Sequence, residues 1–325
     1  MFPFRFSSVD DEDAALTAGA DGGRYIAGGT TLVDLMRQNV ERPQVVVDIN
    51  ALPYREIELR PDSLRVGSVV RMSRLAAHPA VRQNFPAIAE ALEQSASAQL
   101  RNMASIGGNL MQRPRCLYFR DVTAACNRRT PGQGCSAVDG YNRTHAILGT
   151  SDACVATHPS DLAVALVALD AVVHTVDRDG AHEVLIADFF RQPGPTPDRE
   201  HRLSNGGLIT AIEVPATAAA RRSGYLKVRD RASFEFALTS AAVALDISGG
   251  RIRAAHVAAG GVGTVPWRLP AVEGMLTGEI PSQQLFDTAA ALATEGARPL
   301  SQNGFKVELL TRTVARQLGM VAGMR

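Results

Sequence analysis

Apolar residues recur at helical spacing in several parts of the chain. Leu32, Leu35 and Met36 share one helical face after a short strand and a Gly-Gly turn. Residues 162–169 repeat this spacing, and FPAIAEALEQSA predicts a helix that ends near Ser95. The periodicity therefore predicts helices distributed along the whole chain, with the last two at about 283–295 and 303–320.

Short runs rich in β-branched residues predict strands between these helices. The run QVVVDI at 44–49 is one, and VVHTVDRDGAHEVLI predicts a hairpin with Asp-Gly at its turn. The mixture predicts an α+β fold. We expect a first unit at 1–216, divided into subdomains at about 1–50 and 51–216, and a second unit at 217–325.

Composition and charge narrow the possible partners. Hydrophobic residues make up 46% of the 325 residues, which is ample for a core without disulfides. The net charge is +1 and aromatic residues reach only 5%, so neither nucleic acid nor a membrane surface is an expected partner. We see no apolar run long enough to span a membrane and expect no signal peptide on this chain.

Two glycine segments are candidates for phosphate binding. AGGTTL at 27–32 follows a strand and precedes a helix, and ASIGGNL at 104–110 repeats the theme. Glycines allow close approach of a ligand to the backbone, and a helix N-terminus attracts phosphate. A tight turn without a ligand is the alternative for each. Two such loops suit an elongated dinucleotide that crosses a groove between subdomains.

Asp161 and Lys227 are weaker candidates for ligand binding when each is considered by itself. Asp161 lies in HPSDLAVAL, where Ser or Asp is a normal helix N-cap. A functional role would direct its carboxylate at a ribose or ribityl hydroxyl. Lys227 lies in the strand-like run GYLKVRD, and a single lysine on a strand usually faces solvent.

All the cysteines lie within one segment rich in Gly, Pro and Arg. Cys116, Cys126, Cys135 and Cys154 are separated by 9, 8 and 18 residues, with no C-x-x-C pair. Four thiolates suit zinc or an iron–sulfur cluster, while two disulfides or inert thiols remain alternatives. The segment also carries six arginines, which would offset the charge of a thiolate-bound cluster: Arg113, Arg115, Arg120, Arg128, Arg129 and Arg143.

Three motifs together resemble a known family. YIAGGTTLVDLM, RNMASIGGNLM and THPSDLAVALVALDA, in this order, are similar to the FAD-binding medium subunits of molybdenum hydroxylases, which include the xanthine dehydrogenase, aldehyde oxidoreductase and carbon monoxide dehydrogenase flavoproteins. The resemblance covers nearly the whole chain. It implies a two-subdomain FAD-binding domain of the vanillyl-alcohol-oxidase type, followed by a C-terminal α+β domain with a small antiparallel sheet.

The resemblance also implies roles for individual residues. Ser105, Gly108 and Asn109 would form a second FAD contact, Asp161 would bind ribityl or ribose hydroxyls, and Lys227 would approach FAD from the C-terminal domain. No histidine lies near the first glycine loop, so we expect non-covalent FAD. The loop expected to enclose the pyrophosphate and reach the flavin comprises Ile26, Ala27, Gly28, Gly29, Thr30, Thr31 and Leu32.

The cysteine segment, about 112–156, narrows the resemblance. It is similar to an insertion in the flavin subunit of bacterial periplasmic aldehyde oxidoreductases that holds an extra [4Fe–4S] cluster. The resemblance therefore implies that the four cysteines are the cluster ligands. Zinc is the chief alternative metal, and a zinc-stabilised scaffold or binding module without a redox role is the rival function.

The implied function is electron transfer within a heterotrimer. An aldehyde would be hydroxylated at the molybdenum cofactor of a large subunit, and electrons would pass through a small subunit with two [2Fe–2S] clusters to the FAD of this chain. An external acceptor would then take them. No catalytic residue is assigned here. We expect the periplasm, reached by co-export with a partner, or the cytoplasm.

Overall fold

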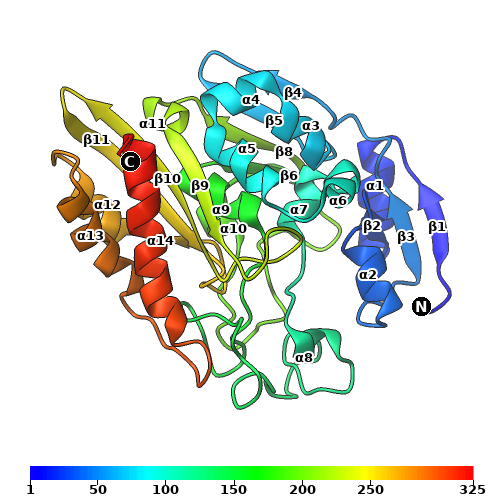
Figure 1. Ribbon diagram of the computed structural model, residues 1–325. Coiled ribbons are helices and arrows are strands. Elements are labelled where there is room, and N and C mark those ends of the chain that lie inside the picture. The colour runs from blue at the N-terminus through cyan, green and yellow to red at the C-terminus, as the bar shows by residue number, and fades with distance from the viewer. Residues whose placement is uncertain (325) are drawn as a thin grey trace.

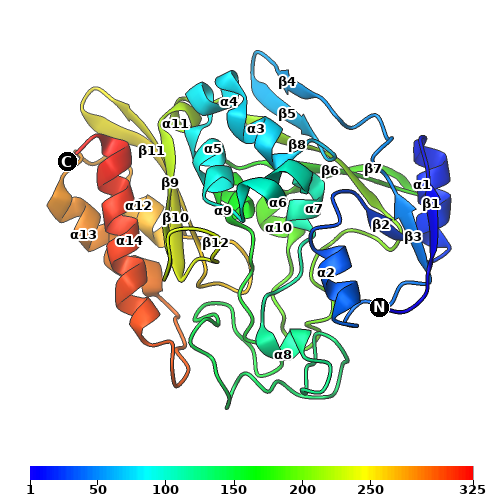
Figure 2. The same cartoon turned by 45° about the vertical axis from the view of Figure 1, so that its right-hand side comes forward.

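Three β-sheets follow one another along the chain. The computed structural model describes residues 1–324, and its sheets have the strand orders β1-β3-β2, β4-β5-β8-β6-β7 and β12-β11-β10-β9. The second sheet lies between the other two in both views (Figures 1 and 2). The expected α+β fold is confirmed, including the small antiparallel sheet near the C-terminus.

The first sheet is parallel and carries two helices. Because β2 and β3 run in parallel, Ile26 pairs with Asp48 and the carboxyl ends of both strands meet at one edge. The turn after β2 and the chain after β3 therefore lie side by side. The elements are β1 (Arg5–Ser8), α1 (Glu12–Ala20), β2 (Arg24–Ile26), α2 (Leu32–Arg37) and β3 (Val45–Asp48).

The second sheet is antiparallel and is built from β4 (Ile57–Leu59), β5 (Ser63–Gly67), β6 (Val172–Asp177), β7 (Gly180–Leu185) and β8 (Leu208–Pro215). The predicted hairpin is confirmed, because Asp177 pairs with Gly180 across its turn. The helices of this unit are α3 (Met72–Ala77), α4 (Pro79–Asn84), α5 (Pro86–Glu93), α6 (Ala98–Met103), α7 (Ile106–Leu110), α9 (Asp161–Ala168) and α10 (Ile186–Phe189).

The cysteine segment connects α7 to α9 and contains little regular structure. Its helix α8 (Leu117–Arg120) is short, and the green chain around it extends below the rest of the molecule in Figures 1 and 2. Buried polar groups anchor it. The Asn142 amide is fully buried, and its two N–H groups are shared among the carbonyls of Ala137, Val138 and Gly140, each 3.2 Å from Nδ2.

The third sheet packs against the C-terminal helices. Strands β10 and β11 pair in antiparallel register, and their apolar side chains form a core with α12, α13 and α14. The elements are α11 (Ala218–Arg221), β9 (Ser223–Val228), β10 (Thr239–Ser248), β11 (Arg251–Gly260), β12 (Trp267–Arg268), α12 (Pro270–Leu276), α13 (Gln283–Ala291), the 3-10 helix η1 (Leu292–Thr294) and α14 (Phe305–Ala322).

One hydrophobic core joins the second and third sheets. Tyr225, Ala242 and Ala258 of the third sheet belong to the same buried cluster as the apolar residues of α5 and α9. Helix α5 packs directly on β9. This shared core places the side chains of β9 beside the start of α9.

The described helices include none that is both long and apolar enough to cross a membrane.

Candidate functional site

A cleft of about 960 Å³ opens between the first and second sheets. One wall is the turn 27–31, and another is the stretch 105–114 at the start of the cysteine segment. The segment 198–209 before and within β8 lines the cleft as well. The lining combines backbone of glycine-rich turns with charged side chains, which suits a long polar ligand.

The turn 27–31 makes a close backbone approach across the cleft. A Cβ on Gly28 would lie 1.9 Å from the carbonyl oxygen of Met103, so no other residue fits there without movement. Gly29 adopts a φ of +70°, a conformation that other residues rarely adopt. Thr31 stands at the N-cap of α2, yet in the described structure its side chain accepts no capping hydrogen bond. The Val33 N–H in the first turn of α2 already donates to the Gly29 carbonyl at 3.0 Å, so the glycine backbone before α2 is the part of the turn suited to a phosphate.

Asn50 and Arg71 hold this turn in place. The Asn50 amide donates to the Ala27 carbonyl at 2.9 Å and to the Asp48 carboxylate at 2.6 Å. Arg71 donates to Asn50 Oδ1 at 2.9 Å and also to the Met103 carbonyl. These contacts tie both sides of the Gly28 approach to one network. Neither supporting residue was identified from the sequence, because their positions carry no motif.

The second glycine segment caps a short helix. Ser105 Oγ accepts a hydrogen bond from the Gly108 N–H at 3.1 Å, which starts α7. Both residues line the cleft. The Asn109 side chain lies deeper, where its Oδ1 accepts a hydrogen bond from Ser160 Oγ at 2.6 Å. Asn109 is outside the lining of the cleft.

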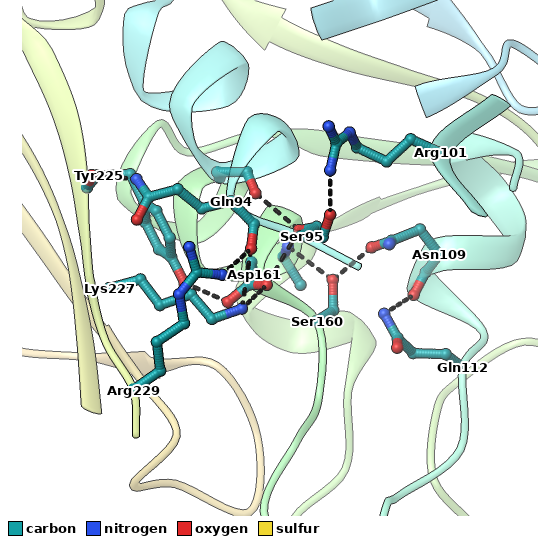
Figure 3. A network of polar contacts seen from close by, with 12 residues as sticks. Gln94, Ser95, Arg101, Asn109, Gln112, Ser160, Asp161, Tyr225, Lys227 and Arg229 are labelled. Atoms are coloured by element: carbon teal, nitrogen blue, oxygen red, sulfur yellow. Dashed lines mark hydrogen bonds and ion pairs between the residues drawn. The ribbon is translucent and has the colours of Figure 1, made fainter. Parts of the chain in front are cut away.

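Asp161 and Lys227 are paired with each other (Figure 3). Lys227 Nζ lies 2.7 Å from Asp161 Oδ2, and their side chains are only 1% and 7% exposed, respectively. Tyr225 OH donates to Asp161 at 2.5 Å, and Ser95 Oγ donates to it at 3.0 Å. Ser160, and not Asp161, is the N-cap of α9. The pair lies outside the cleft lining in this structure, so its contact with FAD stays a prediction.

A chain of ion pairs crosses the cleft wall. Arg113 contacts Glu41 at 2.6 Å and Glu200 at 2.7 Å, and Arg128 contacts the other oxygen of Glu200 at 3.1 Å. These residues come from three distant parts of the chain. The sequence alone shows these arginines only as a source of positive charge, since their acidic partners are remote in sequence.

His158 lies at the boundary between the cleft and the cysteine segment. Its ring packs edge-on against Phe190 with centroids 4.4 Å apart, and its Nδ1 accepts a hydrogen bond from the Ser160 N–H at 3.3 Å. Burial and the charge of Arg128 lower the pKa of His158 to about 3. The ring is therefore neutral at physiological pH, with its proton on Nε2.

All four cysteines line one small cavity. Cys116, Cys126, Cys135 and Cys154 come together although 38 positions separate the first from the last, and none forms a disulfide. Cys126 and Cys135 sit opposite each other in an isolated β-bridge. Within residues 1–324, however, no three or more ligand side chains approach closely enough for a single metal ion.

Polar groups surround these sulfur atoms. The N–H groups of Tyr118 and Phe119 point at the Cys116 sulfur, and His145 Nε2 lies 3.2 Å from it. Burial raises the pKa of the Cys116 thiol to about 12. Burial thus favours the thiol, whereas a metal bound here would supply the positive charge that a thiolate needs.

Comparison with known families identifies the class of protein. Residues 4–217 match the FAD-binding domain in molybdopterin dehydrogenases, and residues 224–319 match the C-terminal domain of carbon monoxide dehydrogenase flavoproteins. The chain therefore belongs to the FAD-binding medium subunits of the molybdenum hydroxylase family, a group of oxidoreductase components. The predicted family is confirmed.

Individual relatives agree with this class. The aldehyde oxidoreductase FAD-binding subunit PaoB of Escherichia coli K12 is 44% identical, with 98% of each chain covered. The glyceraldehyde dehydrogenase medium chain of Sulfolobus acidocaldarius is 26% identical over 93% of this chain and 92% of its own. The reconstituted carbon monoxide dehydrogenase of Oligotropha carboxidovorans shares the fold, with a TM-score of 0.78 at 19% identity and full coverage of both chains.

The structure gathers most of the residues predicted from sequence, but into separate places. Asn109, Asp161 and Lys227 form a buried polar cluster behind the cleft, and the four cysteines form the second cavity. Their roles toward FAD or metal stay predictions. The predicted residues that line the cleft are Ile26, Ala27, Gly28, Gly29, Thr30, Thr31, Leu32, Ser105 and Gly108.

Proposed function

We propose that this chain binds FAD non-covalently in the cleft and serves as the electron-transfer subunit of a molybdenum-dependent aldehyde oxidoreductase. Membership of an FAD-binding family supports the cofactor, and the cleft between the two glycine segments offers a site of suitable shape. The flavin supplies two-electron redox chemistry when bound. The protein's own contribution is the backbone of 27–31, which is suited to the pyrophosphate, and a neutral His158 at the boundary of the cleft.

The substrate class rests on a single relative. The E. coli chain named as an aldehyde oxidoreductase subunit is 44% identical over nearly the full length of both proteins. The proposal therefore places aldehyde oxidation at the molybdenum cofactor of a large partner subunit. A small partner with two [2Fe–2S] clusters would deliver the electrons to this chain. No group on this chain is assigned a role in the hydroxylation itself.

We further propose that Cys116, Cys126, Cys135 and Cys154 hold a [4Fe–4S] cluster. The observation that carries this proposal is their convergence on one enclosed cavity. A tetrahedral zinc ion would need four sulfurs about 3.8 Å apart, given Zn–S bonds of about 2.3 Å. Zinc and a [4Fe–4S] cluster both take four thiolates, so the metal content of the purified complex separates them.

The surroundings of the cavity suit a negatively charged cluster. Backbone N–H groups point at Cys116 and Cys135, and the Arg128 guanidinium lines the same cavity as Cys154. Such donors stabilise thiolate sulfur and set the reduction potential of an iron–sulfur cluster. The cluster would supply one-electron redox chemistry. The rival role as a non-redox scaffold is disfavoured by membership of an oxidoreductase family.

The proposal is tested on the complex purified anaerobically after co-expression with its partner subunits. Iron, acid-labile sulfide, zinc and flavin are quantified, and EPR spectra are recorded before and after dithionite reduction. Cys135→Ala removes one ligand, and Ser136→Ala serves as a neighbouring control that keeps all four cysteines. We expect about four irons in addition to those of the small subunit, one FAD, and an EPR signal lost only in Cys135→Ala.

Each other result has a definite meaning. FAD with zinc, or with no extra metal, would retain the flavoprotein assignment and remove the cluster. A correctly assembled complex without FAD would overturn the proposed cofactor. Aldehydes that fail to reduce the flavin in a fully loaded complex would overturn the proposed substrate class.

A further inference from the structure

One side chain is shared by the cleft and the cysteine cavity. Arg128 lines both, and no other residue in the described range 1–324 does so. Its side chain is only 5% exposed. The position is unusual for arginine, since arginines are rarely buried unless they are paired on all sides.

Arg128 is held from both directions. On the cleft side its Nη1 contacts Glu200 Oε2 at 3.1 Å, and its carbonyl accepts a hydrogen bond from Arg113 at 3.4 Å. On the other side it lines the cavity of the four cysteines, together with Cys154. An arginine guanidinium does not lose its proton in proteins. The guanidinium therefore carries a permanent positive charge between the two cavities.

One hydrogen-bond donor of Arg128 is not used by these contacts. Arg128 Nε is buried and has no hydrogen-bond partner among the described residues. A buried N–H without an acceptor costs free energy, and native proteins usually supply a partner. A ligand that brings acceptor atoms into either cavity would satisfy it.

We infer that Arg128 is a positioning residue that couples the two redox sites by raising the reduction potential of both FAD and the cluster. The inference rests on the proposed function, because it needs a redox centre in each cavity. Each electron that a centre gains makes that centre more negative. A fixed cation beside it therefore favours the reduced state, and little water is present to screen the charge.

A substitution at Glu200 should shift the reduction potentials in the opposite direction. Its carboxylate contacts both Arg128 and Arg113 and thus offsets part of their charge. Glu200→Gln leaves the guanidinium of Arg128 without its acidic partner. If the charge of Arg128 controls the potentials, this variant raises them, whereas Arg128→Gln lowers them.

The experiment uses the co-expressed complex under anaerobic conditions. Potentiometric titration follows the cluster by EPR and the flavin by visible absorbance. The variants are Arg128→Gln, Arg128→Lys and Glu200→Gln. Arg143→Gln is the matched control, because this substitution removes the same charge from the same segment. Arg143 pairs with Asp230 at 2.8 Å and lines neither cavity.

We expect Arg128→Gln to lower both midpoint potentials at unchanged iron and FAD content. Arg128→Lys keeps the charge and should recover most of both shifts, Glu200→Gln should raise both, and Arg143→Gln should change neither. If Arg128→Gln fails to assemble, the rise expected in Glu200→Gln decides the question.

Three negative results are distinguishable. A wild-type complex with four extra irons whose potentials do not move in Arg128→Gln, or in Glu200→Gln, would overturn the coupling and leave the proposed function in place. A wild-type complex without the extra irons would overturn the proposed cluster, and the coupling with it. A shift in only one of the two potentials would also reject the coupling.

Discussion

Buried side chains with full charges dominate the polar chemistry at the scale of single residues. Asp161 and Lys227 lie 2.7 Å apart in the interior, and Tyr225 and Ser95 donate further hydrogen bonds to the carboxylate. Burial of both charges is tolerable because each neutralises the other. The pair therefore fixes β9 against the start of α9, behind the cleft.

Substitution of one member of the Asp161–Lys227 pair should destabilise the fold far more than substitution of both. We expect Lys227→Met to lower the free energy of unfolding by about 3–5 kcal/mol, because it leaves the Asp161 carboxylate buried without a counter-charge. The double variant Asp161→Asn with Lys227→Met should be less destabilised, since no isolated charge remains. Urea denaturation of the full chain measures these two variants and the single variant Asp161→Asn. Strictly additive losses would contradict the ion pair.

Gly28 is a residue whose identity is required by its close contact with the Met103 carbonyl. Gly28→Ala would press a methyl group into the Met103 carbonyl and separate the turn 27–31 from the chain beside it. We expect FAD to bind at least tenfold more weakly, measured by equilibrium dialysis of the reconstituted complex. Gly274→Ala is the control, because a Cβ there meets nothing within 4 Å. Unchanged affinity in Gly28→Ala would show that this approach does not shape the site.

At the scale of elements, hydrogen bonds from side chains anchor the cysteine segment. The segment has little helix or strand, so its backbone groups need other hydrogen-bond partners. Asn142 supplies several of them, and its Oδ1 also accepts from the Gln302 N–H at 3.0 Å, in the connection before α14. One buried amide thus ties the segment both to itself and to the C-terminal unit.

Asn142→Ala should loosen the segment locally. We expect faster hydrogen exchange over 129–142 and a loss of about 2 kcal/mol in the free energy of unfolding, since buried carbonyls lose their donors. Exchange measured by mass spectrometry on the full chain resolves the region. Asn84→Ala is the control, because Asn84 only donates to Ala80 within α4. Equal protection in wild type and Asn142→Ala would show that the anchor lies elsewhere.

Lys306 connects several units at the scale of the whole molecule. It is fully buried, and its Nζ donates to the carbonyls of Thr144 at 3.1 Å and Gly261 at 2.6 Å. It thus joins α14, the cysteine segment and the turn after β11. Burial and the charge of Arg143 lower the pKa of Lys306 to about 7. An uncharged amine can still donate to both carbonyls.

This lowered pKa predicts a specific pH dependence. Between the folded pKa of about 7 and the ordinary value of 10.5, the unfolded chain binds the proton and the folded chain does not. The free energy of unfolding therefore rises with pH in this window, and the contribution is lost as the pH falls through 7. We expect the wild type to gain about 2–3 kcal/mol relative to Lys306→Met between pH 7.5 and 9.5.

Chemical denaturation of both full-length proteins across this range checks the prediction, with the difference between them as the readout. Subtraction removes the tyrosines and other groups that titrate in both proteins. Parallel curves for wild type and Lys306→Met would contradict a lowered pKa for Lys306.

The sequence by itself determined the elements, the family and the candidate cofactor residues. Apolar periodicity predicts α2, α9 and the β6–β7 hairpin because helix and strand spacing are local properties of the chain. The glycine turns and the crowded cysteines are also local signals. They indicated ligands without showing which groups would meet.

Only the tertiary structure decided which of these residues lie together. It separates Asp161 and Lys227 from the cleft and pairs them with each other, and it brings four cysteines to one cavity. It also sets Arg128 between the two cavities, with Glu200 from a remote segment as its partner. Long-range contacts and burial determine ion pairing and pKa, and neither leaves a periodic pattern in the sequence.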